Sequence, residues 1–346
     1  MLDLVLLGCG GGMPTPDRFL SSLLINYRGR KLLIDCGEGT QVSMKMVGWG
    51  FKTIDIICIT HVHGDHIIGL PGLLATIGNS GRRETLTIIG PEGIKEVISS
   101  LRIIVPYLPY DINIIENPKN SLKIKWINDS MEVFKTQNID NFINNHDFNK
   151  TIENENTFSN EYKKNEDTLD YDIKISTLEL EHSCPCIGYS FYINRKAKFN
   201  LEKAEKNNVP KFLWSKLQKG ENLIYEGVKY TSDMVMGRNR RGIKLSYITD
   251  TRPVESIINF IEDSDLFICE GTYGHNEDLH KAIKNKHMTF IESADLAVRA
   301  GVKELILTHF SPALMDPENF KENAINIFPN TIIGKDRFMK TLSFIE

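Results

Sequence analysis

Short apolar runs rich in β-branched residues alternate with turn clusters along the first hundred residues. We expect strands at residues 2–7, 22–27, 31–35, 54–60 and 86–89. The segments at 39–47 and 67–76 have helical spacing, and residues 92–101 follow Pro91 in the way that a helix start does. This alternation of strands and helices predicts a layered protein of the α/β class.

Residues 128–172 interrupt this pattern. These 45 residues hold ten Asn and no Gly or Pro, and eleven acids against four Lys leave a net charge of −7. Because the segment lacks a steady apolar period, we expect an insertion that is loose or only partly helical, with solvation as the simplest reason for its polarity.

Residues 195–244 carry the opposite charge. Thirteen Lys and Arg against five acids give a net charge of +8, although the whole chain is at −4. Residues 200–207 have a helical pattern and Val209-Pro210 ends it. Such a segment is either a solvated Lys-rich loop or a surface that contacts phosphates.

The composition, 41% hydrophobic and 25% charged, is that of a folded globular protein and excludes disorder of the whole chain. The mildly negative charge excludes a globally basic nucleic-acid coat. No apolar run approaches the roughly 18 to 20 residues that cross a bilayer, and no positive residue precedes the short apolar stretch at the N-terminus. Six cysteines without framework spacing favour a reducing, cytoplasmic setting, and we expect no membrane partner.

The strongest chemical signal is the sequence THVHGDH at residues 60–66, which begins at the end of the predicted strand at 54–60. It holds three of the chain's nine histidines within six positions. Alternate residues of an extended backbone share a face, so His61 and His63 can reach one metal ion. Asp65 and His66 then turn toward a second site as a helix begins. The alternative, a set of solvated surface histidines, does not explain this clustering.

A two-metal site needs further ligands, and three polar residues also follow strand-like runs: His182, Asp250 and His309. Any one of them alone is more often a capping or core residue. Their repetition at successive strand ends favours ligation, because the strands of one layer bring their ends together.

The glycine-rich loop at residues 8–12 follows a strand and invites a nucleotide-binding interpretation. Met13 breaks the G-x-G-x-x-G spacing, and no Lys-Ser or Lys-Thr pair follows to make a P-loop. We therefore expect a tight turn beside the active-site edge, with a phosphate cradle for the substrate as the alternative.

The motif at 60–66 with the three later ligands resembles the metallo-β-lactamase superfamily. Within it the chain resembles ribonuclease Z, the endonuclease family that removes 3′ trailers from precursor tRNA, over nearly all residues outside 128–172. Similar elements are LLIDCGEGTQ at 32–41, GLPGLL at 69–74, Gly188-Tyr189, DTRP at 250–253 and FPNT at 328–331. The resemblance implies a single domain over residues 1–346 with a four-layer αββα sandwich, the metallo-β-lactamase fold.

The resemblance also implies the ligand sets of two Zn²⁺ ions, with Mn²⁺ or another divalent metal as an alternative. His61, His63 and His182 would bind one ion; Asp65, His66 and His309 the other; Asp250 would bridge them. Two ions a few Å apart can share a hydroxide that attacks phosphorus and can stabilise both oxygens of an in-line displacement. Asp65 would orient this nucleophile or act as general base.

A Glu–His pair that assists the departing 3′ oxygen is also implied by the resemblance. Glu270 and His287 stand at the matching positions, although their neighbours differ from the usual His-Glu-Ala-Thr and His-Ser-Thr. A helix-capping Glu and an ordinary surface His remain the alternative for this pair.

The family's flexible arm, which clamps tRNA and generally serves the partner subunit of a homodimer, corresponds to residues 195–230. The resemblance therefore implies precursor tRNA and a second copy of the chain as partners. Substrate-facing positions have changed more than metal-facing ones: Arg18 is kept, but Ser311-Pro312-Ala313-Leu314 replaces the usual Ser-x-Arg-Tyr. A hydrolase of a small phosphodiester or sulfate ester, and a catalytically silent RNA-binding relative, are the alternatives to the tRNA enzyme.

Overall fold

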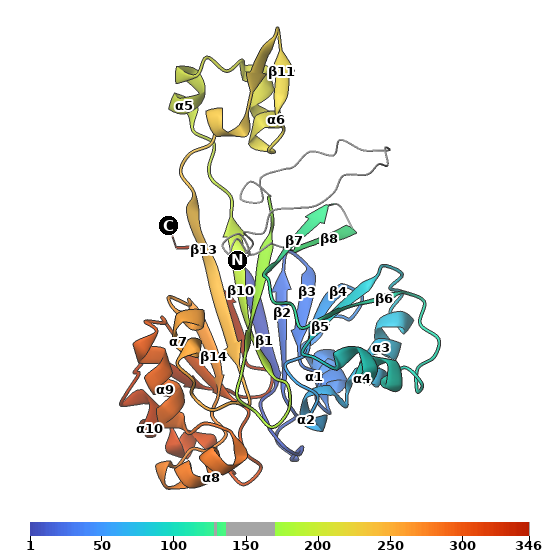
Figure 1. Cartoon of the computed structure of the whole chain (residues 1–346), viewed down its shortest axis with the longest axis vertical. Helices are drawn as coiled ribbons and strands as arrows, with labels where there is room; N and C mark the ends of the chain where they lie inside the picture. Colours follow the sequence, from blue (N-terminus) through green and yellow to red (C-terminus); the bar gives the residue numbers. More distant parts are fainter. Residues whose placement is uncertain (128–129, 136–169, 346) are drawn as a thin grey trace, which may run out of the picture.

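The structure of the chain is a computed structural model, and it describes residues 1–127, 130–135 and 170–345. Two large mixed sheets pack face to face, and helices cover both outer faces (Figure 1). The predicted four-layer αββα sandwich is confirmed. In the described ranges, no helix has both the length and the apolar character needed to cross a membrane.

The first sheet has seven strands in the order β17-β1-β2-β3-β4-β5-β6. Strands β3 to β6 run parallel, and every residue of β4 and β5 is buried, as expected for parallel strands covered on both faces. The strands are β1 (Leu2–Gly8), β2 (Ser22–Tyr27), β3 (Arg30–Ile34), β4 (Ile54–Cys58), β5 (Leu86–Gly90), β6 (Ile112–Glu116) and β17 (Met339–Leu342).

The second sheet has eight strands in the order β16-β15-β14-β13-β10-β9-β7-β8, of which β13 to β16 run parallel. Its strands are β7 (Leu122–Ile127), β8 (Ser130–Lys135), β9 (Ile173–Glu179), β10 (Ile187–Arg195), β13 (Arg240–Ile248), β14 (Leu266–Glu270), β15 (Leu305–Thr308) and β16 (Thr331–Ile333).

Three apolar clusters hold the layers together. The largest lies between the two sheets, and it joins residues such as Leu4 and Ile34 of the first sheet to Phe191 and Leu245 of the second. A second cluster packs the first sheet against α1 (Thr40–Val47), α2 (Gly64–Ile67), α3 (Leu70–Asn79) and α4 (Ile94–Leu101). A third packs the second sheet against α7 (Ser256–Ile261), α9 (Phe290–Arg299) and α10 (Glu322–Ile325). Helix α8 (Leu279–Asn285) and the 3₁₀ turns η5 (Asn276–Asp278) and η6 (Pro317–Phe320) complete this half.

Residues 130–135 differ from the predicted loose insertion, because they form strand β8 and pair with β7. Met131 and Val133 alternate with exposed residues and pack against the cluster between the sheets. The strongly polar composition of residues 128–172 as a whole hides this short apolar alternation. The rest of the predicted insertion, apart from residues 170–172, lies outside the described residues.

Between β10 and β13 the chain forms a small separate unit, residues 196–239, which we call the arm unit. It lies beyond the far ends of these two strands (Figure 1) and has its own small core of six buried side chains: Ala204, Val209, Leu213, Leu217, Tyr230 and Val235. Its elements are α5 (Leu201–Lys206), η3 (Lys211–Leu213), α6 (Trp214–Gln218), β11 (Leu223–Tyr225), β12 (Val228–Tyr230) and η4 (Ser232–Met234). Because Val235 belongs to this core, the unit extends past residue 230, where the sequence places the end of the arm.

Candidate active site

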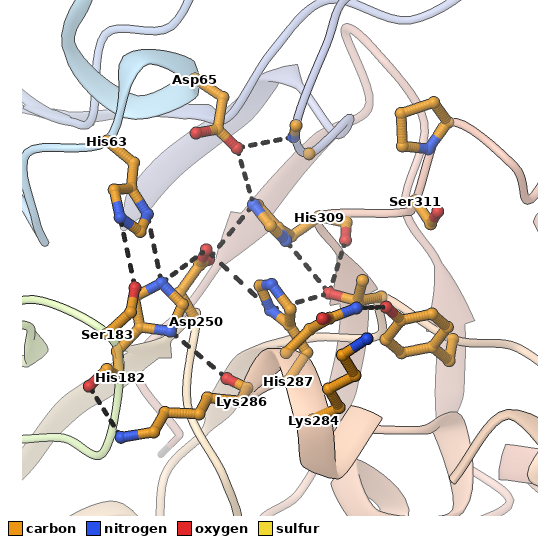
Figure 2. Close-up of a pocket in the computed structure, with 16 residues that line it drawn as sticks. His63, Asp65, His182, Ser183, Asp250, Lys284, Lys286, His287, His309 and Ser311 are labelled. Carbon is orange, nitrogen blue, oxygen red and sulfur yellow. Dashed lines mark hydrogen bonds and ion pairs between the residues drawn. The ribbon is translucent and has the colours of Figure 1, made fainter. Parts of the chain in front are cut away.

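Four chain segments meet at one edge of the sandwich, each just after a strand. The loop after β4 carries His61 and His63, and the short helix α2 that follows carries Asp65 and His66. His182, Asp250 and His309 follow β9, β13 and β15. The structure therefore brings together all seven predicted ligands, although they span almost 250 residues of sequence. Figure 2 shows His63, Asp65, His182, Asp250, His287 and His309 around one pocket.

The first group of ligand atoms belongs to His61, His63, His182 and Asp250. Nδ1 of His63 lies 3.0 Å from Nε2 of His61 and 3.2 Å from Nε2 of His182. Oδ2 of Asp250 lies 3.5 Å from Nε2 of His61 and 3.8 Å from Nε2 of His182. Three imidazole nitrogens and one carboxylate oxygen thus converge on one point.

The second group belongs to Asp65, His66, His309 and again Asp250. Nε2 of His309 lies 3.1 Å from Nε2 of His66, 3.3 Å from Oδ2 of Asp65 and 3.2 Å from Oδ1 of Asp250. Oδ1 of Asp250 is also 3.5 Å from Nε2 of His66. The two oxygens of Asp250 therefore face one group each.

Both groups fit a divalent metal ion. Ligand atoms about 2.0–2.1 Å from a tetrahedral ion lie about 3.3 Å from one another, close to the separations described here. Ring nitrogens that face each other at hydrogen-bond distance inside a protein repel unless a proton or a cation lies between them. A site of three nitrogens and a carboxylate suits zinc chemistry well.

The other ring nitrogen of most of these histidines is held by a polar partner. Asp35 Oδ2 lies 2.7 Å from Nδ1 of His66, and Thr60 Oγ1 lies 3.1 Å from Nδ1 of His61. Thr272 Oγ1 lies 3.2 Å from Nδ1 of His309. Such outer partners set the orientation and tautomer of a metal-binding histidine, so the site is organised for ligation.

Three of these site residues adopt a left-handed backbone although none is glycine. The φ angles of Asp35, Asp250 and His309 are 59°, 51° and 58°. Such a conformation costs roughly 1 kcal/mol or more at each residue and persists where the surroundings over-determine it. The backbone at these strand ends is thus strained in the way that is frequent at functional sites.

The surroundings strongly shift the pKa values of the carboxylates of the site. Burial opposes the charge on Asp65 and Asp250, but the histidines facing them outweigh it and hold both pKa values below their usual range. Burial also raises the pKa of Asp35, and the contact with His66 only partly offsets it. The carboxylates of Asp65 and Asp250 are therefore charged in the folded protein and suited to binding cations.

Glu270 and His287 form a second polar cluster beside the metal groups. Oε2 of Glu270 lies 3.2 Å from Nδ1 of His287 and accepts hydrogen bonds from Thr272 Oγ1 at 2.6 Å and Met288 N at 2.9 Å. Burial lowers the pKa of His287, but the charge and hydrogen bond of Glu270 outweigh this and raise the pKa to about 9. An imidazole held through Nδ1 presents Nε2 on the opposite side of its ring.

Seven of the residues described above line an open pocket of about 510 Å³: His63, Asp65, His182, Asp250, Thr272, His287 and His309. Its other walls are made by Gly11, Gly12, Ser183, Tyr273, Ser311, Pro312 and the segment Lys284–Lys286. Gly12 N donates a 2.6 Å hydrogen bond to Oδ2 of Asp65, so the glycine-rich loop forms a tight turn at the site edge, as predicted. A Cβ at Gly11 would lie 2.4 Å from the ring of His309, which explains the need for glycine there.

Sequence reasoning missed the residues that hold the ligands. Asp35 lies within a run that carries the family resemblance and Thr272 lies near Glu270, yet nothing in their spacing indicates which side chain they orient. A polar residue at the end of an otherwise buried strand is the one usable signal, and Asp35 after β3 shows it.

Comparisons with known proteins agree with this geometry. The chain is 57% identical over 347 residues to ribonuclease Z of Clostridium beijerinckii and 56% identical over 344 residues to that of Clostridium perfringens. These alignments cover 100% and 99% of both chains, respectively. The solved structure of human tRNase Z, short form, has a TM-score of 0.62 at 20% identity and covers 99% of this chain and 100% of its own. The family model described as Anti-Pycsar protein Apyc1 matches residues 2–204.

Proposed function

The chain belongs to the ribonuclease Z family and, through residues 2–204, to the family described as Anti-Pycsar protein Apyc1, and we propose that it removes the 3′ trailer of precursor tRNA. The observation that carries this proposal is the arrangement of Asp250, shared by two groups of ligands, with the Glu270–His287 pair beside it. That arrangement suits hydrolysis of a phosphodiester, and the ribonuclease Z relatives supply the substrate class.

We assign His61, His63 and His182 to one metal ion, Asp65, His66 and His309 to a second, and Asp250 to both. When bound, two divalent ions lower the pKa of water and neutralise the charge that develops on the phosphate during displacement. We propose Zn²⁺ as both ions because histidine nitrogens and carboxylate oxygens are its usual ligands and three imidazoles serve the first group, with Mn²⁺ as the alternative; elemental analysis of the purified protein distinguishes them.

Asp65 has a second role in this proposal. Its Oδ2 atom faces His66 and His309 and accepts the hydrogen bond from Gly12 N. Oδ1 is then the atom that orients the attacking water and accepts its proton. The fixed glycine loop keeps the carboxylate from rotating away from this position.

His287 protonates the 3′ oxygen of the tRNA as the phosphodiester bond breaks, and the tRNA leaves with a 3′-hydroxyl. Glu270, buried and tied by hydrogen bonds from Thr251 N and Thr272 Oγ1, holds Nδ1 of His287. The imidazole therefore keeps one orientation, with Nε2 available to the leaving oxygen.

We further propose that the arm unit binds the body of the tRNA. It carries nine Lys and Arg against five acids between residues 196 and 239, and three of its cations, Lys203, Lys206 and Arg238, line a shallow groove. Cationic side chains on such a protruding unit provide contacts to the phosphate backbone that do not depend on sequence.

The proposed assembly is a homodimer acting in the cytoplasm, as the family resemblance implies. The loop after α4 supports an interface, because Ile103, Ile104 and Tyr107 are 80%, 71% and 94% exposed. All six cysteines are free thiols, in agreement with a reducing compartment. Light scattering at several concentrations tests the dimer, and Ile104→Asp should shift it toward the monomer.

The first experiment is cleavage of a 3′-extended precursor tRNA by the metal-loaded protein over a series of salt concentrations. We expect a cut near the end of the acceptor stem, loss of cleavage in Asp65→Ala, and a steep fall of affinity with salt. If precursor tRNA stays intact while a small chromogenic phosphodiester or sulfate ester is hydrolysed, the protein is a small-substrate hydrolase. If neither substrate is hydrolysed and RNA still binds, the protein is a catalytically silent RNA-binding relative.

A further inference from the structure

The segment from His287 to Thr289 is fixed to its surroundings at every peptide group. His287 N donates to Ala282 O at 2.9 Å, Met288 N to Glu270 Oε2 at 2.9 Å and Thr289 N to Glu292 Oε2 at 2.9 Å. Of the three carbonyls, His287 O accepts a hydrogen bond from the guanidinium of Arg252. Met288 O accepts one from Tyr273 N at 3.2 Å, and Thr289 O accepts one from Ser293 N at 3.1 Å. The backbone that carries His287 is thus held by elements from three parts of the chain.

Arg252 lies two residues after Asp250, in the turn that follows β13. Its guanidinium also contacts both carboxylate oxygens of Glu292, with Nη1 3.1 Å from Oε2. The two side chains are only 16% and 17% exposed, so solvent screens this pair less than a surface pair. Arg252 therefore joins the turn of the shared metal ligand to the segment of the proposed proton donor.

Glu292 binds both Arg252 and the segment that carries His287. It is the third residue of α9, where its carboxylate accepts the hydrogen bonds of Thr289 N and Thr289 Oγ1 in a capping box. One carboxylate thus holds both the start of the helix and the guanidinium of Arg252. A bidentate Arg–carboxylate pair has a defined geometry that a lysine does not reproduce.

The fixed backbone of this segment places His287 close to both Asp250 and Glu270. Nδ1 of His287 lies 4.0 Å from Oδ2 of Asp250 and 3.2 Å from Oε2 of Glu270. The same turn supplies Thr251 N, which donates to Glu270 Oε1 at 2.7 Å. A displacement of about 1 Å in such a group can slow catalysis about 100-fold, so the placement of this segment matters for rate.

We propose that Arg252, together with Glu292, is a positioning residue that fixes the main chain of His287 relative to Asp250 so that the imidazole reaches the leaving oxygen. This inference rests on the proposed role of His287 as proton donor. It concerns Arg252 and Glu292, neither of which touches the substrate in our assignment.

The test uses two substrates that differ in the need for a proton on the leaving group. The 3′-extended precursor tRNA has a sugar oxygen as leaving group, whereas a p-nitrophenyl phosphodiester releases a stable phenolate that needs no proton. For Arg252→Met and Glu292→Gln we expect kcat on precursor tRNA to fall about 10- to 100-fold, the usual size of outer-shell effects. KM for tRNA and kcat on the p-nitrophenyl ester should stay within about threefold, and metal content should not change.

A conservative variant and a matched control complete the experiment. Arg252→Lys keeps the charge and a donor for the His287 carbonyl, so it should recover part of the lost rate. Arg299→Met removes another Arg–Glu pair at the opposite end of the same helix α9, where Arg299 contacts Glu255 at 2.7 Å, and it should leave both activities unchanged.

Equal slowing of both substrates in Arg252→Met, or loss of metal, would show a merely structural role and overturn the inference. No change on precursor tRNA would also overturn it. The proposed function fails separately, if the unaltered protein does not cleave precursor tRNA, and the role of His287 fails if His287→Ala slows both substrates alike.

Discussion

The pocket and the arm unit differ in how their polar side chains are held. In the pocket, buried groups such as His66 and Glu270 have several partners each, and these partners come from different parts of the chain, up to 243 positions away for His66 and His309. In the arm unit, the cations Lys206 and Arg238 lie on a groove over a core of only six buried side chains. The first region has the rigidity that the proposed catalysis requires, and the second has the accessible charge that suits the proposed binding of tRNA.

This difference implies that chemistry and recognition can be separated by mutation. Changes in the metal-binding side chains of the pocket should affect every phosphodiester substrate, because they act on the reacting atoms. Changes in the arm unit should affect only substrates large enough to reach it. A small chromogenic phosphodiester and a precursor tRNA, measured side by side, report on the two regions.

The largest effect is expected from Asp250→Ala. Asp250 serves both ligand groups, so the variant should lose metal and lose activity on both substrates by about 10³-fold or more. Elemental analysis and rates on both substrates measure this. Asp295→Ala, an exposed aspartate on α9, is the control, and full activity of Asp250→Ala would refute the assignment of a shared ligand.

The second largest effect is expected from Gly11→Ala. The added Cβ would lie 2.4 Å from the ring of His309, so the ring must move and the second metal group should weaken about 10- to 100-fold in affinity. Metal titration measures the affinity. Gly64→Ala lies in the same histidine motif but finds no atom within 4 Å, so it should bind metal normally; identical behaviour of the two variants would contradict the explanation.

A smaller and substrate-selective effect is expected from Leu217→Ala. Leu217 is fully buried in the core of the arm unit, and removing its side chain costs about 2–5 kcal/mol of local stability. We expect kcat/KM on precursor tRNA to fall about tenfold, as when a few phosphate contacts are lost, while the small substrate is unaffected. Leu201→Ala, at a half-exposed position of α5, is the matched control. A parallel loss on both substrates would show that the two regions are coupled.

The smallest effect is expected from Lys206→Ala and Arg238→Ala, each of which removes one cation from the groove of the arm unit. Each should weaken tRNA binding a few-fold and reduce the slope of log affinity against log salt by about 0.7–0.9. Binding titrations at several salt concentrations measure the slope. An unchanged slope in both variants would place the tRNA elsewhere.

Local patterns predicted much of the fold. The strands β1 to β5 occur where the apolar runs predict them, because four or five consecutive buried positions in each strand require apolar side chains. The helix predicted at 67–76 begins three residues later, at Leu70, because Pro71 is accommodated in a first turn. Strand β8 was missed because its partners, β7 and the cluster between the sheets, decide its conformation.

The candidate ligands could be predicted from the sequence, and the residues that orient them could not. His61, His63, Asp65 and His66 stand within one short segment, so their spacing alone indicates a shared metal. Asp35 and His66 are 31 positions apart and Thr272 and His309 are 37 apart, and no local pattern connects such pairs. Arg252 and Glu292, 40 positions apart, are a further example.

The sequence by itself determined the layered fold class, the histidine motif and the family, because each is written in short-range patterns of side chains along the strands and their ends. Only the tertiary structure decided that the two oxygens of Asp250 face different ligand groups, that Asp35 and Thr272 orient histidines, and that the arm unit has a core of its own. These features depend on which strand ends meet at one edge, and that is set by the packing of the two sheets rather than by any single segment.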